Sequence, residues 1–250
     1  AANIQNNRSF QKNDSRLSLE LRHILKDPNP KIFVAIPNMF GNPGSEYVDT
    51  SVISWALLWH KYLRKWKPLL SRKSTYLDAN LSRLYIDRRK KEASRRRFMK
   101  IAQLWNSERV LIVEGESTLL GVKNNLLDKA KEVVRIEVPA IDAYAFVDEI
   151  EHKIRESSAL FDVCILAIGP TATVLVNRLS DLQQSFYDLG HFDLEYEWML
   201  MKAKERSNVG GRFVNEIRED SVFPNTIWQE DESRQVIGSV SSQKVNKDRK

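Results

Sequence analysis

The chain has 250 residues, of which 42% are hydrophobic and 29% are charged, and its formal net charge is +6. That length and composition suit one large α/β domain. The single cysteine, Cys164, excludes a disulfide framework and a thiolate metal cluster. Apolar runs fall well short of the roughly 20 residues that span a bilayer, so we expect a protein that is not transmembrane and that works in a reducing cytoplasm.

The surplus of positive charge lies mainly in Arg83 to Lys100 and in the last few residues. Most of the first cluster falls on a predicted helix, where consecutive side chains point around the axis and several meet water. A solvated helix explains this pattern, and an acidic partner, a membrane surface or a nucleotide phosphate are alternatives. Because the charge does not follow an extended binding face, we expect no nucleic-acid partner.

The first half of the chain mixes helical and strand patterns. Apolar residues from Leu17 to Leu25 repeat at helical spacing, and Lys31 to Ile36 then reads as a short buried strand. The helix predicted over Val52 to Trp66 is rich in tryptophan, and we expect its tryptophans to lie in the core or in the wall of a groove. Another helix is predicted over Lys90 to Trp105.

The second half alternates regularly between strands and helices. Strands are predicted at Arg109 to Val113, Arg135 to Val138, Asp162 to Ile168 and Ser185 to Asp188, with helices at Leu119 to Val133, Ala143 to Ser157 and Thr171 to Leu182. This alternation predicts an α/β, Rossmann-like fold with a mostly parallel sheet flanked by helices. We expect one domain over residues 1–228 and a polar, disordered tail over residues 229–250.

Polar residues gather in the loops that follow the strands, where open parallel sheets collect their ligands. The first strand of this half runs into Glu114, Gly115 and Glu116, and the glycine permits a close backbone approach. These residues predict a ligand-facing loop. Ser117 or Thr118 could instead cap a helix, and a glutamate near that helix N-terminus would be favourable.

A second loop combines a glycine turn with hydroxyl side chains. Gly169 and Pro170 precede Thr171 and Thr173, and proline at the first position of a helix leaves the amides of the helix start exposed. This turn suits a phosphate group. It lacks the lysine of a Walker loop and the three glycines of a dinucleotide fingerprint, so it is a general signal of phosphate binding.

The third stretch, Gly190 to Trp198, carries His191, Asp193, Glu195 and Glu197 directly after a buried strand. Close carboxylates repel one another, so such clustering is typical of a functional site or of ion pairing. On a helix that begins near Asp193, this residue and Glu197 share a face. Capping of the helix by Asp193, with solvated glutamates after it, is the alternative.

Several ordered motifs between Ser9 and Glu216 resemble one known family. They are Ser82-Arg83, Val113-Glu114-Gly115-Glu116, Gly121-Val122, Asn125-Leu126, Arg135-Ile136, Pro139-Ala140, Gly169 to Leu175, Gly190 to Trp198 and Val214-Asn215-Glu216. In this order they resemble the bacterial glycosyltransferases of the GT-D fold, formerly domain of unknown function 1792, which glycosylate serine-rich repeat adhesins. The resemblance implies a GT-D-type Rossmann-like fold, a UDP-sugar donor and a divalent metal, manganese or magnesium.

The sequence departs from the family pattern in three places. Family members carry an Asp-x-Glu motif upstream of the segment that resembles Ser9-Phe10-Gln11, and we expect it to be missing from this chain together with the metal ligands. The usual Asn-Asp-Leu reads Asn124-Asn125-Leu126, and the usual Asn-Ala reads Asp142-Ala143. The last two changes bear on donor preference.

We therefore expect a glycosyltransferase that moves a sugar from a UDP-sugar to a glycan or glycoprotein acceptor. The expected catalytic residues are Asp193 and Glu195 as base candidates, with His191 and Glu197 beside them. The expected donor-binding residues are Arg83, Glu114, Gly115, Glu116, Asn125, Gly169, Thr171 and Thr173. A nucleotide-sugar hydrolase and a non-catalytic nucleotide-sugar-binding partner subunit are the alternatives. The sequence is compatible with a homo-oligomer but contains no feature that predicts one.

Overall fold

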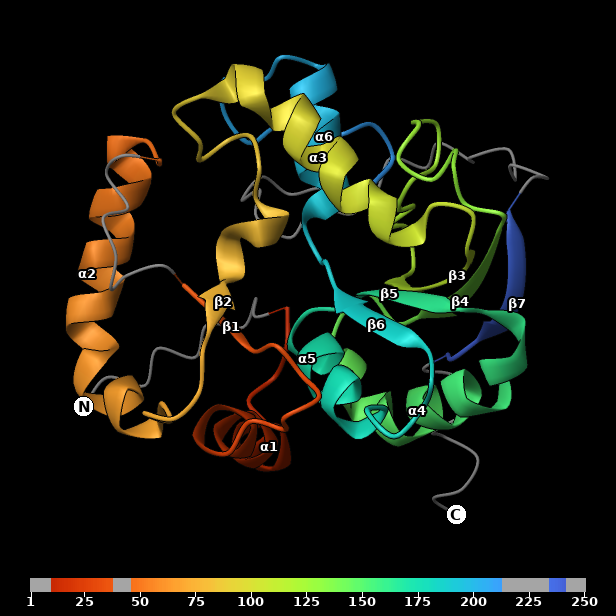
Figure 1. Ribbon diagram of the computed structural model, residues 1–250, viewed down its shortest axis with the longest axis horizontal. Coiled ribbons are helices and arrows are strands. Elements are labelled where there is room, and N and C mark those ends of the chain that lie inside the picture. The colour runs from red at the N-terminus through yellow and green to blue at the C-terminus, as the bar shows by residue number, and fades with distance from the viewer. Residues whose placement is uncertain (1–9, 38–45, 213–233, 242–250) are drawn as a thin grey trace.

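The computed structural model describes residues 10–37, 46–212 and 234–241. A five-stranded parallel sheet in the order β6-β5-β3-β4-β7 forms its centre, with helices on both faces (Figure 1). The strands are β3 (Arg109–Gly115), β4 (Glu132–Val138), β5 (Val163–Ala167), β6 (Ser185–Asp188) and β7 (Gln235–Ser239). The predicted α/β class with a parallel sheet is confirmed.

The described α-helices are α1 (Ser15–Lys26), α2 (Asp49–Trp66), α3 (Ser94–Ala102), α4 (Val147–Glu156), α5 (Pro170–Arg178) and α6 (Phe192–Leu200). A small parallel pair, β1 (Ala35–Ile36) and β2 (Leu77–Asp78), stands beside the main sheet. The Asp14 side chain caps α1 by accepting a hydrogen bond from the Leu17 N–H at 2.9 Å. Within the described ranges, no helix combines the length and the apolar character needed to cross a membrane.

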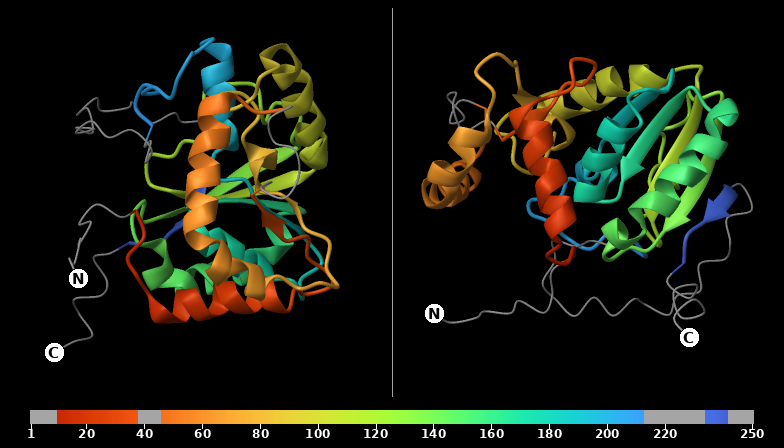
Figure 2. Two further views of the ribbon diagram at one scale, coloured as in Figure 1. Left: turned by 90° about the vertical axis from the view of Figure 1, so that its left-hand side faces the viewer. Right: turned by 90° about the horizontal axis from the view of Figure 1, so that it is seen from below.

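The core has two halves because successive residues of a buried strand point to opposite faces of the sheet. On β3, Leu111 and Val113 pack against α1, α4 and α5, whereas Val110 and Ile112 pack against α3 and α6. The left view of Figure 2 shows the sheet between these two helical layers. Both faces of the sheet are therefore covered, as an all-parallel sheet requires.

The helix predicted over Leu119 to Val133 is wrong. Turns connect β3 to β4, and Ser117, Leu119 and Lys123 have positive φ angles, which a right-handed helix excludes. The amides of this segment bond to carboxylates instead: the Leu120 N–H donates to Glu114 at 2.7 Å and the Gly121 N–H donates to Asp193 at 2.9 Å. The spacing of Leu120, Leu126 and Leu127 suggested a helix, but these residues belong to a loop and pack into the core beside the sheet.

Strand β7 lies inside the segment that was expected to be a disordered tail. It pairs with β4 in parallel, and Val240, just after it, is buried in the core. The strand is short, and the residues before and after it are mostly polar, so the stretch as a whole resembled a tail. Residues 229–233 and 242–250 lie outside the described part of the chain.

Helix α2 stands apart from the layered body, at the left of Figure 1. Its half-buried Trp55 makes an edge-to-face contact with Tyr47, with ring centroids 4.9 Å apart. Trp66, near the end of the helix, is 43% exposed. Of the two expected placements, core or groove wall, the core placement fails for Trp66, because α2 does not join either layer of the main core. The side chain of Trp59 lies outside the described part of the chain.

Candidate active site

The order of the strands creates a switch point at the centre of the sheet. The chain runs from β3 to its neighbour β4 on one side, and then crosses back to β5 on the other side of β3. At such a point the loops that follow the two central strands diverge and leave a crevice beyond their carboxyl ends. The fold therefore provides a binding site between the ends of β3 and β5.

A cleft of about 300 Å³ occupies this position. Gly115 ends β3, Pro139 follows β4, Gly169 follows β5 and Asp188 ends β6, and all four line the cleft. Arg83 lines it as well, from the segment after the small β1-β2 pair. Residues separated by about a hundred positions in the sequence are therefore brought together by the sheet.

Asp188 is the carboxylate of the cleft wall. It accepts a hydrogen bond from the Thr173 hydroxyl at 2.7 Å. Asp188 remains exposed to solvent in part. Desolvation nevertheless raises the pKa of Asp188, and hydrogen bonds from Thr173 and the Gly190 N–H, with the charge of His191, oppose this rise. A carboxyl group with a raised pKa is a stronger base when it is ionised, which suits the removal of a proton from a hydroxyl group.

Two glycines bring the backbone close to the cleft. Gly169 has a φ of +59°, and a Cβ there would lie 2.3 Å from the Phe10 ring. A Cβ on Gly115 would lie 2.9 Å from the Cα of Ala140. Side chains at these positions would displace the cleft walls, so glycine at both positions keeps the backbone close to the cleft.

Cationic and amide groups face the same space. Pro170 begins α5 next to the cleft, and its fixed φ suits the first turn of a helix, whose free N–H groups attract anions. Arg83 adds a guanidinium group that can donate two hydrogen bonds to a phosphate. This side of the cleft is therefore suited to a phosphorylated ligand.

Part of the expected site is assembled in the cleft, whose walls include the following predicted residues: Arg83, Gly115, Gly169, Thr173 and His191. The other predicted residues are not among its walls: Glu114, Glu116, Asn125, Thr171, Asp193, Glu195 and Glu197. Most of these make contacts within the protein.

Glu195 is fully buried and accepts hydrogen bonds from the backbone N–H groups of Tyr85 and Ile86 at 2.8 and 2.9 Å. Burial raises the pKa of this carboxyl group, and the two N–H donors oppose the rise. Its contacts fix the segment that directly follows Arg83. Glu195 thus helps to hold in place the segment that carries Arg83 in the cleft wall.

Asp193 and Glu197 share one face of α6, as their spacing predicts, and that face meets a loop. Asp193 accepts hydrogen bonds from the Gly121 N–H at 2.9 Å and from the Asn124 amide at 2.8 Å. The Asn124 amide also donates to Glu197. Arg212 forms ion pairs with both carboxylates. The pKa of Arg212 falls to about 10 because burial disfavours its charge.

The remaining predicted residues also lie outside the cleft. Glu114 is buried and pairs with Arg135 at 2.5 Å. Glu116 is exposed, and Asn125 accepts a hydrogen bond from the Tyr196 hydroxyl at 2.5 Å. Thr171 is fully buried. Their expected roles in donor binding stay predictions that the geometry of the cleft does not support.

The cleft is also lined by residues that were not among the expected site residues. These are Asp188, Phe10, Ser82, which was a family marker, and Thr118, which lies in the predicted ligand-facing loop. Asp188 carried a usable signal, since it ends a predicted strand and directly precedes Leu189-Gly190-His191. The rule that ligands collect after parallel strands points to it as clearly as to Glu114. Phe10 had no comparable signal, because only the tertiary fold brings its ring to Gly169.

Comparison with known proteins shows which family the chain resembles. The family model for the glycosyltransferase GT-D fold matches residues 2–217. The chain is 32% identical over 198 residues to glycosyltransferase GlyD of Streptococcus pneumoniae serotype 4 (strain ATCC BAA-334 / TIGR4), covering 79% of this chain and 24% of that protein. It is also 32% identical over 211 residues to the probable glycosyl transferase Gly of Streptococcus gordonii, covering 83% and 30%. The chain thus spans less than a third of either relative.

Solved structures give the same result. One of domain of unknown function 1792, described as a distinct glycosyltransferase fold, matches with a TM-score of 0.85 at 28% identity, covering 92% of this chain and 82% of that one. A new glycosyltransferase of this type from Streptococcus sanguinis matches with a TM-score of 0.83 at 30% identity, covering 94% and 88%. The switch-point cleft, the ordered motifs and these matches together show that the chain belongs to the glycosyltransferase family of the GT-D fold.

Proposed function

We propose that the switch-point cleft binds a UDP-sugar and that the chain transfers its sugar to a hydroxyl group of a glycan or glycoprotein. The pair formed by Asp188 and Thr173, which lines the same cleft as the cationic Arg83, carries this proposal, because a base and a phosphate-binding group share one cleft. Membership of a glycosyltransferase family agrees with this use of the cleft. The buried thiol Cys164 suits a reducing, cytoplasmic setting.

In the proposed reaction, the acceptor oxygen attacks the anomeric carbon of the sugar while the bond from that carbon to the diphosphate breaks. Asp188 takes the proton of the acceptor hydroxyl, and the bonding electrons leave with UDP. Arg83 and the N–H groups at the start of α5 then face the charge that develops on the diphosphate. His191, also in the cleft wall, lies where it can orient the acceptor or donor.

The divalent metal implied by the family resemblance requires more donors than the described cleft supplies. Asp188 and His191 are the carboxylate and imidazole groups in its wall, and no group of three or more candidate ligands occurs within residues 10–37, 46–212 and 234–241. These residues alone do not fit a complete metal site. The proposed reaction is therefore described with the protein's own residues. Manganese or magnesium is varied in the binding experiment.

Calorimetric titration with UDP and a panel of UDP-sugars, with and without manganese, tests the proposal. We expect saturable binding, and Arg83→Ala should weaken it by about tenfold or more because a charged phosphate contact is lost. Arg96→Ala is the matched control, since Arg96 is exposed on α3 and is not part of the cleft wall. Failure of every nucleotide to bind, or equal binding by Arg83→Ala, would contradict the proposal.

A further inference from the structure

The segment from Thr50 to Leu77 has an unusual charge. It contains six lysines and arginines and no aspartate or glutamate, although the chain as a whole carries 33 acidic residues. The cations are Lys61, Arg64, Lys65, Lys67, Arg72 and Lys73. They occupy the second half of α2, the short 3₁₀ helix Lys67–Leu69 and the turn after it. A solvated surface helix normally mixes both signs of charge.

The same segment exposes large apolar side chains. Ile53 is 59% exposed, Leu57 is 69% exposed and Trp66 is 43% exposed. Isolated exposed apolar residues are ordinary, but these three occur on one helix that also carries three of the six cations. Apolar side chains next to a purely basic run are typical of helices that lie in a membrane interface.

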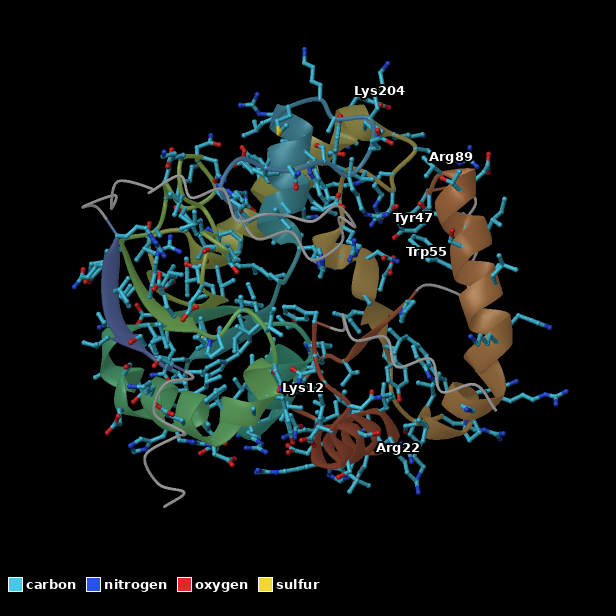
Figure 3. The ribbon with its side chains drawn as sticks, turned by 180° about the vertical axis from the view of Figure 1, so that it is seen from behind. Lys12, Arg22, Tyr47, Trp55, Arg89 and Lys204 are labelled. Atoms are coloured by element: carbon cyan, nitrogen blue, oxygen red, sulfur yellow. The ribbon has the colours of Figure 1, made fainter. Side chains whose placement is uncertain are left out.

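The placement of α2 makes this surface available. Trp55 contacts Tyr47 and holds one side of the helix toward the body, and Figure 3 shows these two labelled side chains between α2 and the rest of the molecule. At 100° per residue, Ile53, Leu57 and Arg64 lie within about 40° of one another on a different side of the helix from Trp55. After Asp49, which begins the helix and pairs with Arg89, that outward side is apolar at Ile53 and Leu57 and basic at Arg64. Trp66 lies on the same side of the helix as Trp55.

We propose that α2 and the turn after it dock this protein on an anionic bilayer surface. Ile53 and Leu57 enter the boundary between headgroups and acyl chains, and the basic second half of the segment meets the negative headgroups. Docking of this kind is peripheral and does not require a membrane-spanning helix. It goes beyond sugar transfer and does not depend on it.

Cosedimentation with vesicles tests the proposal. The protein is mixed with vesicles of phosphatidylcholine alone and with vesicles that also contain phosphatidylglycerol. We expect binding to the anionic vesicles, little binding to the neutral ones, and a fall in binding as salt screens the charges. Absence of binding to anionic vesicles at low salt overturns the proposal, as does equal binding to both kinds of vesicle.

Variants separate this surface from general positive charge. Arg64→Glu/Lys65→Glu should weaken vesicle binding by more than about tenfold, because each cation near an anionic surface contributes appreciably. Ile53→Ser/Leu57→Ser should weaken it without changing the charge. The matched control is Lys129→Glu/Lys131→Glu, which reverses two exposed lysines just before β4, at the end of the sheet opposite the cleft.

The control should bind within about twofold of the parent chain, and UDP binding should be retained in all three variants, since none of these residues lines the cleft. Equal loss in the control would show that total charge, rather than α2, determines binding. Binding to RNA or to an acidic protein with no binding to vesicles would also overturn the proposal. If the parent chain bound vesicles but not UDP, the proposed function would be contradicted and the membrane proposal would stand.

Discussion

The carboxylates of α6 show how far residue identity alone predicts chemistry. Clustering correctly indicates that Asp193, Glu195 and Glu197 have specific partners, but these partners are backbone N–H groups, Asn124 and Arg212. Whether these carboxylates catalyse a reaction or form ion pairs depends on whether their face of α6 is directed toward a cleft or toward another part of the protein. That orientation depends on packing between distant segments, so the sequence alone could not decide between them.

The contact between Asp193 and Arg212 should be important for stability. Asp193→Asn removes one charge of a buried pair and leaves Arg212 only partly compensated by Glu197, so we expect a loss of about 3 kcal/mol in the free energy of unfolding. Urea denaturation measures it. Glu116→Gln, at an exposed carboxylate, should change stability by less than about 0.5 kcal/mol. Equal stability of the two variants would contradict a structural role for Asp193.

At the scale of elements, patterns that depend on local periodicity predicted the fold well. Strands β3 to β6 and helices α4 and α5 lie where alternation placed them, because buried strands and amphipathic helices have distinct periods. The loop between β3 and β4 and the edge strand β7 were missed. Both are stabilised by contacts with distant parts of the chain, such as Gly121 with Asp193 and Arg234 with Glu137.

Arg178 joins three helices and should make stability depend on pH. It forms ion pairs with Glu20 of α1 and with Asp148 and Glu151 of α4. Hydrogen bonds from Arg16 and Arg178 lower the pKa of Asp148 to about 2. A lowered carboxyl pKa stabilises the fold above the unfolded value of about 3.9, and this contribution is lost as the pH falls through about 2.

We therefore expect Arg178→Gln to lower the free energy of unfolding at pH 7 by about 1–2 kcal/mol. The expected effect is this small because Asp148 is largely exposed and water screens its ion pair. The difference from the parent chain should shrink as the pH falls from about 4 toward 2. Denaturation measured across this range checks it. A difference that is constant with pH would exclude these carboxylates as its cause.

Strand β7 should contribute to stability although its sequence resembles a tail. Val240 is 1% exposed and belongs to the core cluster on the α4 face of the sheet. Val240→Ala should cost about 2 kcal/mol of unfolding free energy through lost burial and a small cavity. Val236→Ala is the matched control, since Val236 is 43% exposed. If both variants are as stable as the parent chain, β7 does not dock as described.

At the scale of the whole molecule, the site is a product of strand order. The sheet order β6-β5-β3-β4 brings Gly115, Gly169 and Asp188 together at the carboxyl ends of the strands, and Arg83 joins them from the segment after β2. The sequence predicted a site at the strand ends, and the cleft lies there. It could not predict which strand ends lie next to one another, because strand order is set by crossover connections and two-sided packing.

The same global arrangement distinguishes the two proposed surfaces. The nucleotide-sugar site uses the carboxyl ends of the main sheet, whereas the proposed membrane surface uses α2, outside both core clusters. Variants in one region should leave the other intact, because distant sites without shared partners behave independently.

The most direct test compares Asp188→Asn with Glu197→Gln in the release of UDP from UDP-sugars in the presence of acceptor. Asp188 lines the cleft, whereas Glu197 pairs with Arg212 outside it. We expect Asp188→Asn to lower kcat by about 100-fold or more with UDP binding retained, and Glu197→Gln to retain kcat while losing stability. Full activity of Asp188→Asn together with an inactive but stably folded Glu197→Gln would contradict the account and return the chemistry to the acidic face of α6.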